Sequence, residues 1–508
     1  MKTPIARRTR YRLWTTKWLW IPVLVMVIVL LGCTISRSPV TGERAYYGYT
    51  WQEEKDLGAQ ADKQIQARYG IYQEGDITKY VQGVAQKVLE HSHLRGEGVA
   101  EQYRETEFTF RVLDSPVINA FALPGGYVYV TRGLLAYLQN EAQLAVVLGH
   151  EIGHVAERHA SRQAFQQTLG QIGLLGGAIL GQEVFNVPAQ QILDVGGTAV
   201  QLLHLRYSRE HERESDHLGV EYAAKAGYKA SEGSSFFWVL EQMGERDGQT
   251  LPTFLSTHPD PGNREEMITE LAAKWSDSTE TTIVNQEQYM NQLRDLVFSE
   301  NPRQGFVRDG MFYHPDMQFQ FSIPSGWKVQ NTASQVVILE PEQQAALIFS
   351  TDPEAKSVKE AAERFAGQQG VQVERVSETS VHDMPAYRVI ATAQSQQNNQ
   401  RIRLLSVFIR KSDTIYQFMA FSNDALFSTY ASIFQKTIRS FDDLQDRKIL
   451  QIQPWRLTLI TTDHQGSLEE FVPAETSEEF GLSMLGILNQ LQPNTVLREN
   501  HTIKIPRR

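Results

Sequence analysis

The chain has 508 residues, more than one domain usually holds, so its length predicts two or three domains. Hydrophobic residues make up 41% and charged residues 21%, which excludes a mainly disordered, collagen-like or polytopic membrane chain. The net charge of −10 argues against nucleic-acid binding, and the single cysteine excludes both a disulfide framework and a cysteine-based zinc cluster.

Residues 1–32 have the pattern of a secretory signal peptide, because a basic stretch ending at Lys17 precedes the uncharged run 18–32. As a helix, that run would reach roughly 22 Å, less than the ~30 Å hydrocarbon core, although an uncleaved membrane anchor is an alternative. The tetrapeptide LLGC resembles a bacterial lipobox, which implies cleavage before Cys33 and lipidation of its thiol. Residues 33–50 would then tether an outer-membrane lipoprotein that faces the periplasm.

A mostly helical unit is expected over residues 51–275, with strands inside 105–131, where apolar residues alternate around a Pro-Gly-Gly turn. The apolar, glycine-rich stretch 169–182 is too short to span a bilayer. We expect it to be a covering segment or a buried helix, and the alternative is that it lines a substrate groove.

The chemistry-bearing motif is HEIGH at residues 150–154. Residues four apart share one face of a helix, so His150 and His154 can bind one zinc ion together. Glu151 lies one step around the helix and can reach a metal-bound water without being a ligand. Asn140 suits the N-cap of this helix, and the glycine inside the motif can let another segment approach the metal.

A second helical pattern over 197–226 contains three candidates for the third ligand: Glu210, Glu212 and Glu214. At about 100° per residue, only Glu212 lies on the apolar stripe, and the other two lie about 200° away. Zinc would compensate this otherwise costly buried carboxylate, and Asp216, one turn later, would accept a ligand imidazole N–H. The stripe comprises Leu202, Leu205, Arg209, Glu212, Asp216, Gly219, Val220 and Ala223. Rival ligands off the stripe are His211 and His217.

GHEIGHVAERHA, followed about sixty residues later by SREHERESD, resembles the HtpX-like and BepA-like zinc metallopeptidases, gluzincins of peptidase family M48 with HExxH followed by ExxxD. The resemblance covers residues 50–275 and implies His150, His154 and Glu212 as ligands of one Zn²⁺, with Glu151 as catalytic base. Further matching blocks are Asn119-Ala120, Pro124-Gly125-Gly126, Gly133-Leu134-Leu135, Thr257-His258-Pro259 and Arg264.

The sequence departs from both groups in what accompanies the peptidase motifs. HtpX-like proteins have several membrane spans, which are not expected here, so the resemblance implies the secreted lipoprotein branch. BepA-like proteins carry a helical-repeat tail where this sequence has an α+β segment, so their partners are not carried over.

The resemblance implies peptide-bond hydrolysis, in which Glu151 takes a proton from the attacking water and returns it to the leaving amine. His258 and Arg264 are candidate donors to the tetrahedral oxyanion. Alternatively, His258 occupies the open zinc position and holds the enzyme inactive. Asn119 and Ala120 begin a segment that we expect to form an edge strand, which would pair with extended peptides and favour unfolded substrates.

Beyond the peptidase region, residues 276–310 are expected to be a linker. The alternating pattern over 311–443 predicts an α+β domain, faintly similar to a PsbP-like sandwich. Residues 444–508 slightly resemble a degenerate LysM-like module, through Leu488-Asn489 and the stretch 503–506, which implies peptidoglycan contact. The alternative for this module is a plain domain cap.

Together these patterns predict an α+β fold: a mostly helical zincin-type metallopeptidase domain with a small sheet, a smaller α+β domain and a short C-terminal module. The predicted function is a lipid-anchored zinc metalloendopeptidase of the bacterial envelope that acts on unfolded or misassembled envelope proteins. One alternative is a non-catalytic, chaperone-like or assembly-binding lipoprotein with a structural zinc, although such a site would not need Glu151. The other is an integral inner-membrane peptidase.

Overall fold

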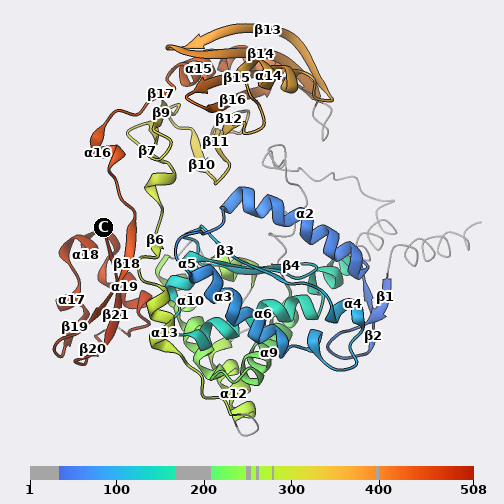
Figure 1. Cartoon of the computed structure of the whole chain (residues 1–508), viewed down its shortest axis with the longest axis vertical. Helices are drawn as coiled ribbons and strands as arrows, with labels where there is room; N and C mark the ends of the chain where they lie inside the picture. Colours follow the sequence, from blue (N-terminus) through green and yellow to red (C-terminus); the bar gives the residue numbers. More distant parts are fainter. Residues whose placement is uncertain are drawn as a thin grey trace, which may run out of the picture.

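The computed structural model describes residues 34–167, 207–247, 253–258, 263–276, 280–394, 400–492 and 494–508. The expected signal peptide, Cys33 and the stretch 169–182 lie outside the described residues. The described chain mixes helices and sheets, and Figure 1 shows a largely helical body below a sheet-rich domain. No helix within the described ranges combines the length and apolarity needed to cross a bilayer.

The body begins with a hairpin of β1 (Thr34–Arg37) and β2 (Arg44–Tyr47), which pair antiparallel. The helices that follow are α2 (Trp51–Tyr69), α3 (Ile77–Glu90), the 3₁₀ turn His93–Arg95 and α4 (Glu101–Arg104). A capping box begins α2, because the Thr50 side chain accepts the Glu53 N–H and the Glu53 carboxylate accepts the Thr50 N–H.

The small sheet expected within 105–131 is present. It contains β3 (Thr109–Leu113), β4 (Ala120–Leu123) and β5 (Tyr127–Thr131) in the order β3-β5-β4. β3 runs parallel to β5, and β4 pairs antiparallel with β5 through a turn whose glycines have positive φ. Strand β4, which starts at Ala120, is therefore an edge strand.

The motif helix α6 (Glu141–Ala156) follows the short helix α5 (Arg132–Tyr137), and every residue of α6 is buried. Asn140 caps it as expected, accepting the Gln143 N–H through its side chain. Helix α6 crosses α9 (Arg209–Lys225) at Gly149, where an added Cβ would lie 2.8 Å from the carbonyl oxygen of Gly219. The two helices approach this closely because glycine stands on both.

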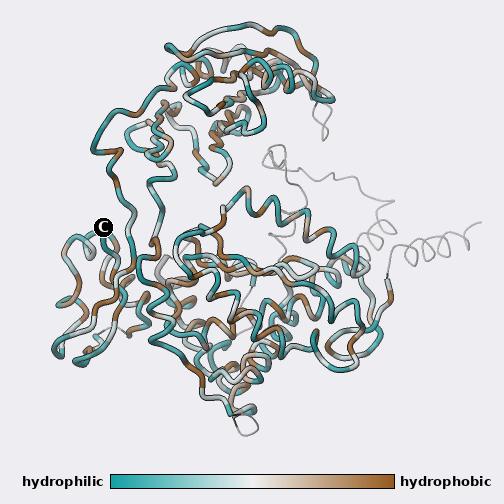
Figure 2. Tube along the Cα trace, in the orientation of Figure 1, coloured by the Kyte–Doolittle hydropathy of each residue, from teal (hydrophilic) through white to brown (hydrophobic). Residues whose placement is uncertain are grey.

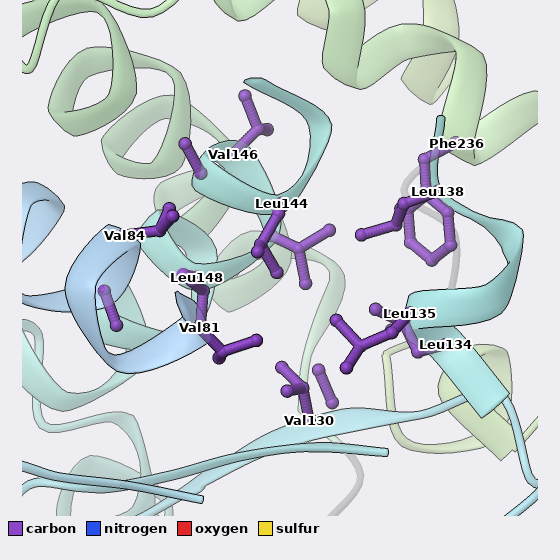
Figure 3. Close-up of a cluster of buried hydrophobic side chains, with 14 of the residues drawn as sticks. Val81, Val84, Val130, Leu134, Leu135, Leu138, Leu144, Val146, Leu148 and Phe236 are labelled. Carbon is purple, nitrogen blue, oxygen red and sulfur yellow. The ribbon is translucent and has the colours of Figure 1, made fainter. Parts of the chain in front are cut away.

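The main hydrophobic core lies between α6, α3 and the small sheet (Figure 3). Val81 and Val84 of α3, Val130 of β5 and Leu148 of α6 point into it. Further helices among the described residues of the body are the 3₁₀ turn Ala230–Gly233, α10 (Ser234–Asp247), α11 (Thr253–Thr257), α12 (Arg264–Ser276) and α13 (Gln286–Gln292).

The stretch 276–310 is not the simple linker that its composition suggested. Helix α13 and strand β6 (Val297–Phe298) contribute Tyr289, Met290 and Val297 to the main core. The 3₁₀ turn Pro302–Gln304 follows β6. The polar composition of residues 276–310 did not indicate this packing, because the buried positions are few and widely spaced along the stretch.

The C-terminal module shares the core of the peptidase body. Its strand β18 (Trp455–Thr461) pairs with β6 on one side and β21 (Thr502–Arg507) on the other. The buried ammonium of Lys504 donates to the carbonyl oxygens of Ala136 and Leu138, at 2.6 and 2.8 Å. The other elements of the C-terminal module are β19 (Gly466–Ser467), α17 (Leu468–Phe471), α18 (Ala474–Phe480), α19 (Leu482–Leu488) and β20 (Val496–Leu497). The residues behind the LysM-like resemblance are thus engaged in packing, which favours the domain-cap alternative.

The upper domain has hydrophobic clusters of its own. A seven-stranded antiparallel sheet has the order β10-β11-β12-β16-β15-β14-β13, and a four-stranded sheet has the order β17-β9-β8-β7. Hydrophobic and hydrophilic residues both occur along the chain of this domain (Figure 2). The elements are β7 (Phe306–Arg308), β8 (Met311–His314), β9 (Phe319–Ser322), β10 (Lys328–Asn331), β11 (Gln335–Leu339), β12 (Ala345–Thr351), α14 (Val358–Ala366), β13 (Val371–Val381), β14 (Met384–Gln394), β15 (Arg401–Lys411), β16 (Thr414–Asn423), the 3₁₀ turn Asp424–Leu426, α15 (Phe427–Arg439), β17 (Asp442–Asp443) and α16 (Arg447–Leu450).

Candidate metal centre

Helices α6 and α9 bring the three expected zinc ligands together in the interior. The Nε2 atoms of His150 and His154 are 3.0 Å apart. The Glu212 carboxylate lies 3.5 Å from each of these nitrogens. Ligand atoms around a tetrahedral zinc ion with bonds of about 2.0–2.1 Å are roughly 3.3 Å from one another. The spacing and the chemistry of this nitrogen and oxygen set therefore fit zinc.

Buried charge supports the same conclusion. Burial acts to raise the pKa of Glu212, but His258 and the bonds from the histidines hold it well below its usual range, so the carboxylate is charged. Glu151 is fully buried, and neither of its carboxylate oxygens has a hydrogen-bond partner among the described residues. Burial raises the pKa of the Glu151 carboxyl. A cation beside Glu212 would balance acidic groups that the interior otherwise disfavours.

Asp216 and Arg264 contact the expected zinc ligands His150 and Glu212 and orient them. The Nδ1–H of His150 donates to Asp216 at 2.8 Å, which leaves the Nε2 lone pair directed at the ligand cluster. Arg264 donates to both oxygens of Asp216 and, at 3.2 Å, to Glu212. Asp216 thus lies where the helical phase placed it. Arg264 contacts the two carboxylates of α9, and its candidate role as an oxyanion donor stays a prediction.

His258 lies among the ligands themselves, directly after α11. Its Nδ1 atom is 3.1 Å from Glu212 and 3.4 Å from the Nε2 atom of His150. One atom from each of His150, His154, Glu212 and His258 lies within 4.8 Å of the others, so this cluster of four could hold a metal ion. The fourth member occupies the side on which a catalytic site would admit water or substrate.

The expected substrate-binding residues lie beside the same helix. Asn119 is buried, and its Oδ1 atom has no hydrogen-bond partner among the described residues. Ala120 starts the edge strand β4 and is also buried. The Phe254 N–H of α11 donates to the Ile118 carbonyl at 3.3 Å, so α11 is hydrogen-bonded to the segment just before β4.

The rival ligands lie elsewhere. Glu210 is exposed, and His217 is exposed beside Glu221. His211 is buried, but its ring stacks on that of His159 at 4.3 Å and it is not part of the metal-binding group. The expected stripe is wrong at Arg209, which is exposed because α9 begins there, after the N-cap Ser208. Leu202 and Leu205 lie outside the described residues.

Two residues that the sequence analysis did not select reach the site. The Nδ1 atom of His159 is 2.9 Å from that of His154, and its Nε2 atom is 2.8 Å from Glu214. The Tyr207 ring stacks on the His154 ring at 4.2 Å. The available signal was the second histidine in HVAERH, five residues after His154. Its significance depends on what the far side of a ligand ring contacts, which helical periodicity does not reveal.

Comparison with known proteins places the peptidase motifs in a family. Residues 79–272 match the model of Peptidase family M48. The putative beta-barrel assembly-enhancing protease of Vibrio cholerae is 35% identical over 32% of this chain and 34% of its own length. The human mitochondrial metalloendopeptidase OMA1 is 34% identical over 33% of each chain. The chain thus spans about a third of the length of these curated relatives.

A solved structure also shows a limited similarity. Cyanobacterial PsbP from Synechocystis sp. PCC 6803 matches 26% of this chain and 91% of its own length, with 16% identity and a TM-score of 0.23. That score is too low to bear on the PsbP-like domain expected over 311–443, which stays a prediction. The family match, in contrast, contains both histidines of HExxH, Glu212, His258 and Arg264. Residues 79–272 of this chain therefore match a domain of Peptidase family M48, and the cluster that could hold a metal ion lies within the matched residues.

Proposed function

We propose that the chain is a zinc-dependent metalloendopeptidase that hydrolyses unfolded or misassembled proteins of the bacterial envelope. The carrying observation is the convergence of His150, His154 and Glu212 with a buried Glu151 beside them. The relative named beta-barrel assembly-enhancing protease supports envelope proteins as the substrate class.

His150, His154 and Glu212 would hold the zinc ion, which when bound supplies Lewis acidity toward water and the scissile carbonyl. Glu151 accepts the proton of the attacking water and returns it to the leaving amine. Burial raises the pKa of Glu151, which suits a group that must alternate between base and acid near neutral pH. Asp216 fixes the His150 ring through its Nδ1–H.

The edge strand β4 supports a preference for extended chains. An extended peptide can add to a free sheet edge through main-chain hydrogen bonds, which a folded protein does not offer. The buried Asn119 Oδ1 atom adds an acceptor at the start of that edge. Unfolded or misassembled proteins are therefore the proposed substrates.

The proposed location is the periplasmic face of the outer membrane, with a lipid anchor on Cys33. The signal-like run 18–32 and the LLGC tetrapeptide support it. Mass spectrometry of the purified protein tests it: a lipidated amino-terminal Cys33 is expected, whereas residues 1–32 still attached would favour the integral inner-membrane alternative. Peptidoglycan contact by the C-terminal module is a separate proposal, which sedimentation with purified sacculi tests.

The variant Glu151→Gln tests the enzymatic proposal. Loss of a general base lowers activity by roughly 10²–10⁴-fold, so casein degradation should fall by that factor while bound zinc, measured by elemental analysis, stays at the wild-type level. The matched control is Glu210→Gln, an exposed acid on α9, which should leave both readouts unchanged. Zinc bound in both proteins, with no casein degradation by either the wild type or Glu151→Gln, would instead support a chaperone-like lipoprotein with a structural zinc.

A further inference from the structure

The two histidines of the motif are supported in different ways on the side of the ring away from the ligand cluster. His150 donates its Nδ1–H to the carboxylate of Asp216. The Nδ1 atom of His154 instead faces the Nδ1 atom of His159 at 2.9 Å, and His159 has no exposed surface. Two ring nitrogens at this distance form a hydrogen bond only if one carries a proton and the other a lone pair.

The far side of the His159 ring determines which nitrogen is the donor. Its Nε2 atom lies 2.8 Å from the Glu214 carboxylate, which Arg162 binds at 2.7 Å. An ionised carboxylate only accepts hydrogen bonds, so the Nε2 atom of His159 carries a proton. In a neutral imidazole the Nδ1 atom is then the acceptor, and the bond runs from His154 Nδ1–H to His159.

This direction has a consequence for the metal ligand. With its proton on Nδ1, His154 presents a lone pair at Nε2, the atom that lies 3.0 Å from His150 Nε2 and 3.5 Å from Glu212. If His159 donated instead, the neutral His154 ring would carry its proton on Nε2 and could not bind a metal there.

The local backbone explains how a residue so close in sequence can turn back onto the motif. Helix α6 ends at Ala156, and Arg158 has a φ of 56°, a conformation that is uncommon for a residue with a side chain. The Arg158 guanidinium holds this turn through Glu54 at 2.6 Å. His159 then lies beside His154, and its ring stacks on the His211 ring. The Ser215 Oγ atom is more distant, at 3.4 Å from the Nδ1 atom of His159.

We propose that His159, oriented by Glu214, is a positioning residue that holds His154 in the tautomer that binds zinc. The inference rests on the zinc site of the proposed function, but not on catalysis. In this proposal the hydrogen-bonded series His154–His159–Glu214–Arg162 supports His154. Asp216 and Arg264 have the corresponding role for His150.

The test is the zinc dissociation constant of the full chain, measured by chelator competition, together with the melting temperature of the metal-free protein. His159→Phe keeps an aromatic ring but removes the acceptor, and loss of such a support weakens metal affinity by about 10–100-fold. His159→Asn places its Oδ1 atom near the position of Nδ1 and should restore affinity to within about threefold of wild type. The matched control His211→Phe changes the stacked neighbour in the same way and should bind zinc like wild type.

The comparison separates positioning from packing. If His159→Phe and His159→Asn lower the melting temperature equally, only a positioning role predicts that the asparagine variant recovers zinc affinity. The proposal would be overturned if His159→Phe bound zinc with wild-type affinity, or if both His159 variants lost zinc affinity equally. It would also be overturned if His211→Phe lost as much zinc affinity as His159→Phe, or if the wild type bound no zinc. Zinc affinities that follow the expected order in a chain that does not degrade casein, even with His258 replaced by Ala, would uphold this inference and refute the peptidase function.

Discussion

At the scale of single residues, the position of His258 bears on the proposed activity. A catalytic zinc site keeps one position open, whereas a fourth protein ligand makes the site structural. The Nδ1 atom of His258 lies within hydrogen-bond distance of Glu212 and His150, inside the ligand cluster, and α11 is hydrogen-bonded to Ile118, just before edge strand β4. Both contacts favour the inhibitory latch over the substrate-side donor.

We therefore expect His258→Ala to raise casein degradation severalfold at saturating zinc, because the position that water needs is released. Its zinc affinity should fall, since one of four ligands is lost. The control Glu270→Gln changes an exposed residue of the neighbouring helix α12 and should behave like wild type. A fall in activity with zinc still bound would show that His258 acts as a donor to the substrate.

A second residue-scale prediction concerns His314 in the upper domain. Burial lowers the pKa of His314 to about 4, and its Nδ1 atom accepts the Met317 N–H at 3.2 Å. The unfolded chain, in which the pKa of histidine is about 6.5, binds more protons between these values, so the domain loses stability as pH falls from 6.5 to 4. Calorimetry should show this loss, and His314→Phe should reduce it, whereas His382→Asn, at an exposed turn, should not.

At the scale of elements, the crossing of α6 and α9 brings the ligands together. Glycines 149 and 219 let the two backbones approach, so that Glu212 reaches both imidazoles of the neighbouring helix. An inserted methyl group would meet backbone atoms, which cannot move aside as a flexible side chain can.

Gly149→Ala is accordingly expected to destabilise the peptidase body by about 1–3 kcal/mol and to weaken zinc binding. Gly83→Ala, in α3, has nothing within 4 Å of the added Cβ and should stabilise the helix by up to about 1 kcal/mol. Calorimetry of the metal-free proteins measures both effects. Equal stability of Gly149→Ala and wild type would mean that the helices separate without penalty.

At the scale of the whole molecule, the upper domain is inserted between two parts of one core. The chain leaves the body after β6 and returns at β18, and these strands pair with each other. The two connections meet where Arg303 donates to the carbonyl oxygens of Leu450 and Ile452, each at 3.2 Å. The upper domain, although it follows the peptidase body directly in sequence, thus packs less against that body than the C-terminal module does.

We expect that replacing residues 306–446 with a short glycine-serine linker leaves a folded, zinc-binding protein. Truncation after residue 443 should instead destabilise the peptidase body by several kcal/mol, because burial of each large apolar side chain contributes about 1.5–3 kcal/mol. The side chains lost from the shared core would be Trp455, Leu457, Leu485 and Leu488. Zinc binding and circular dichroism on both proteins test this, and equal stability of the two would contradict it.

The sequence by itself determined the features that depend on local periodicity. Helical spacing selected His150 and His154 as a pair, and helical phase selected Glu212 over Glu210 and Glu214, because side-chain direction along a helix follows from residue number. The alternation within 105–131 similarly predicted the small sheet. The family resemblance rested on these spacings together with the further matching blocks.

Only the tertiary structure decided which residues lie behind and opposite the ligands. His258 reaches the cluster from another helix, His159 depends on a turn with positive φ, and β18 pairs with a strand more than 150 residues earlier. Such contacts carry no periodic signal, because they are set by how distant segments pack. Periodicity assigns a side chain to a face of its own element, and only packing determines what that face meets.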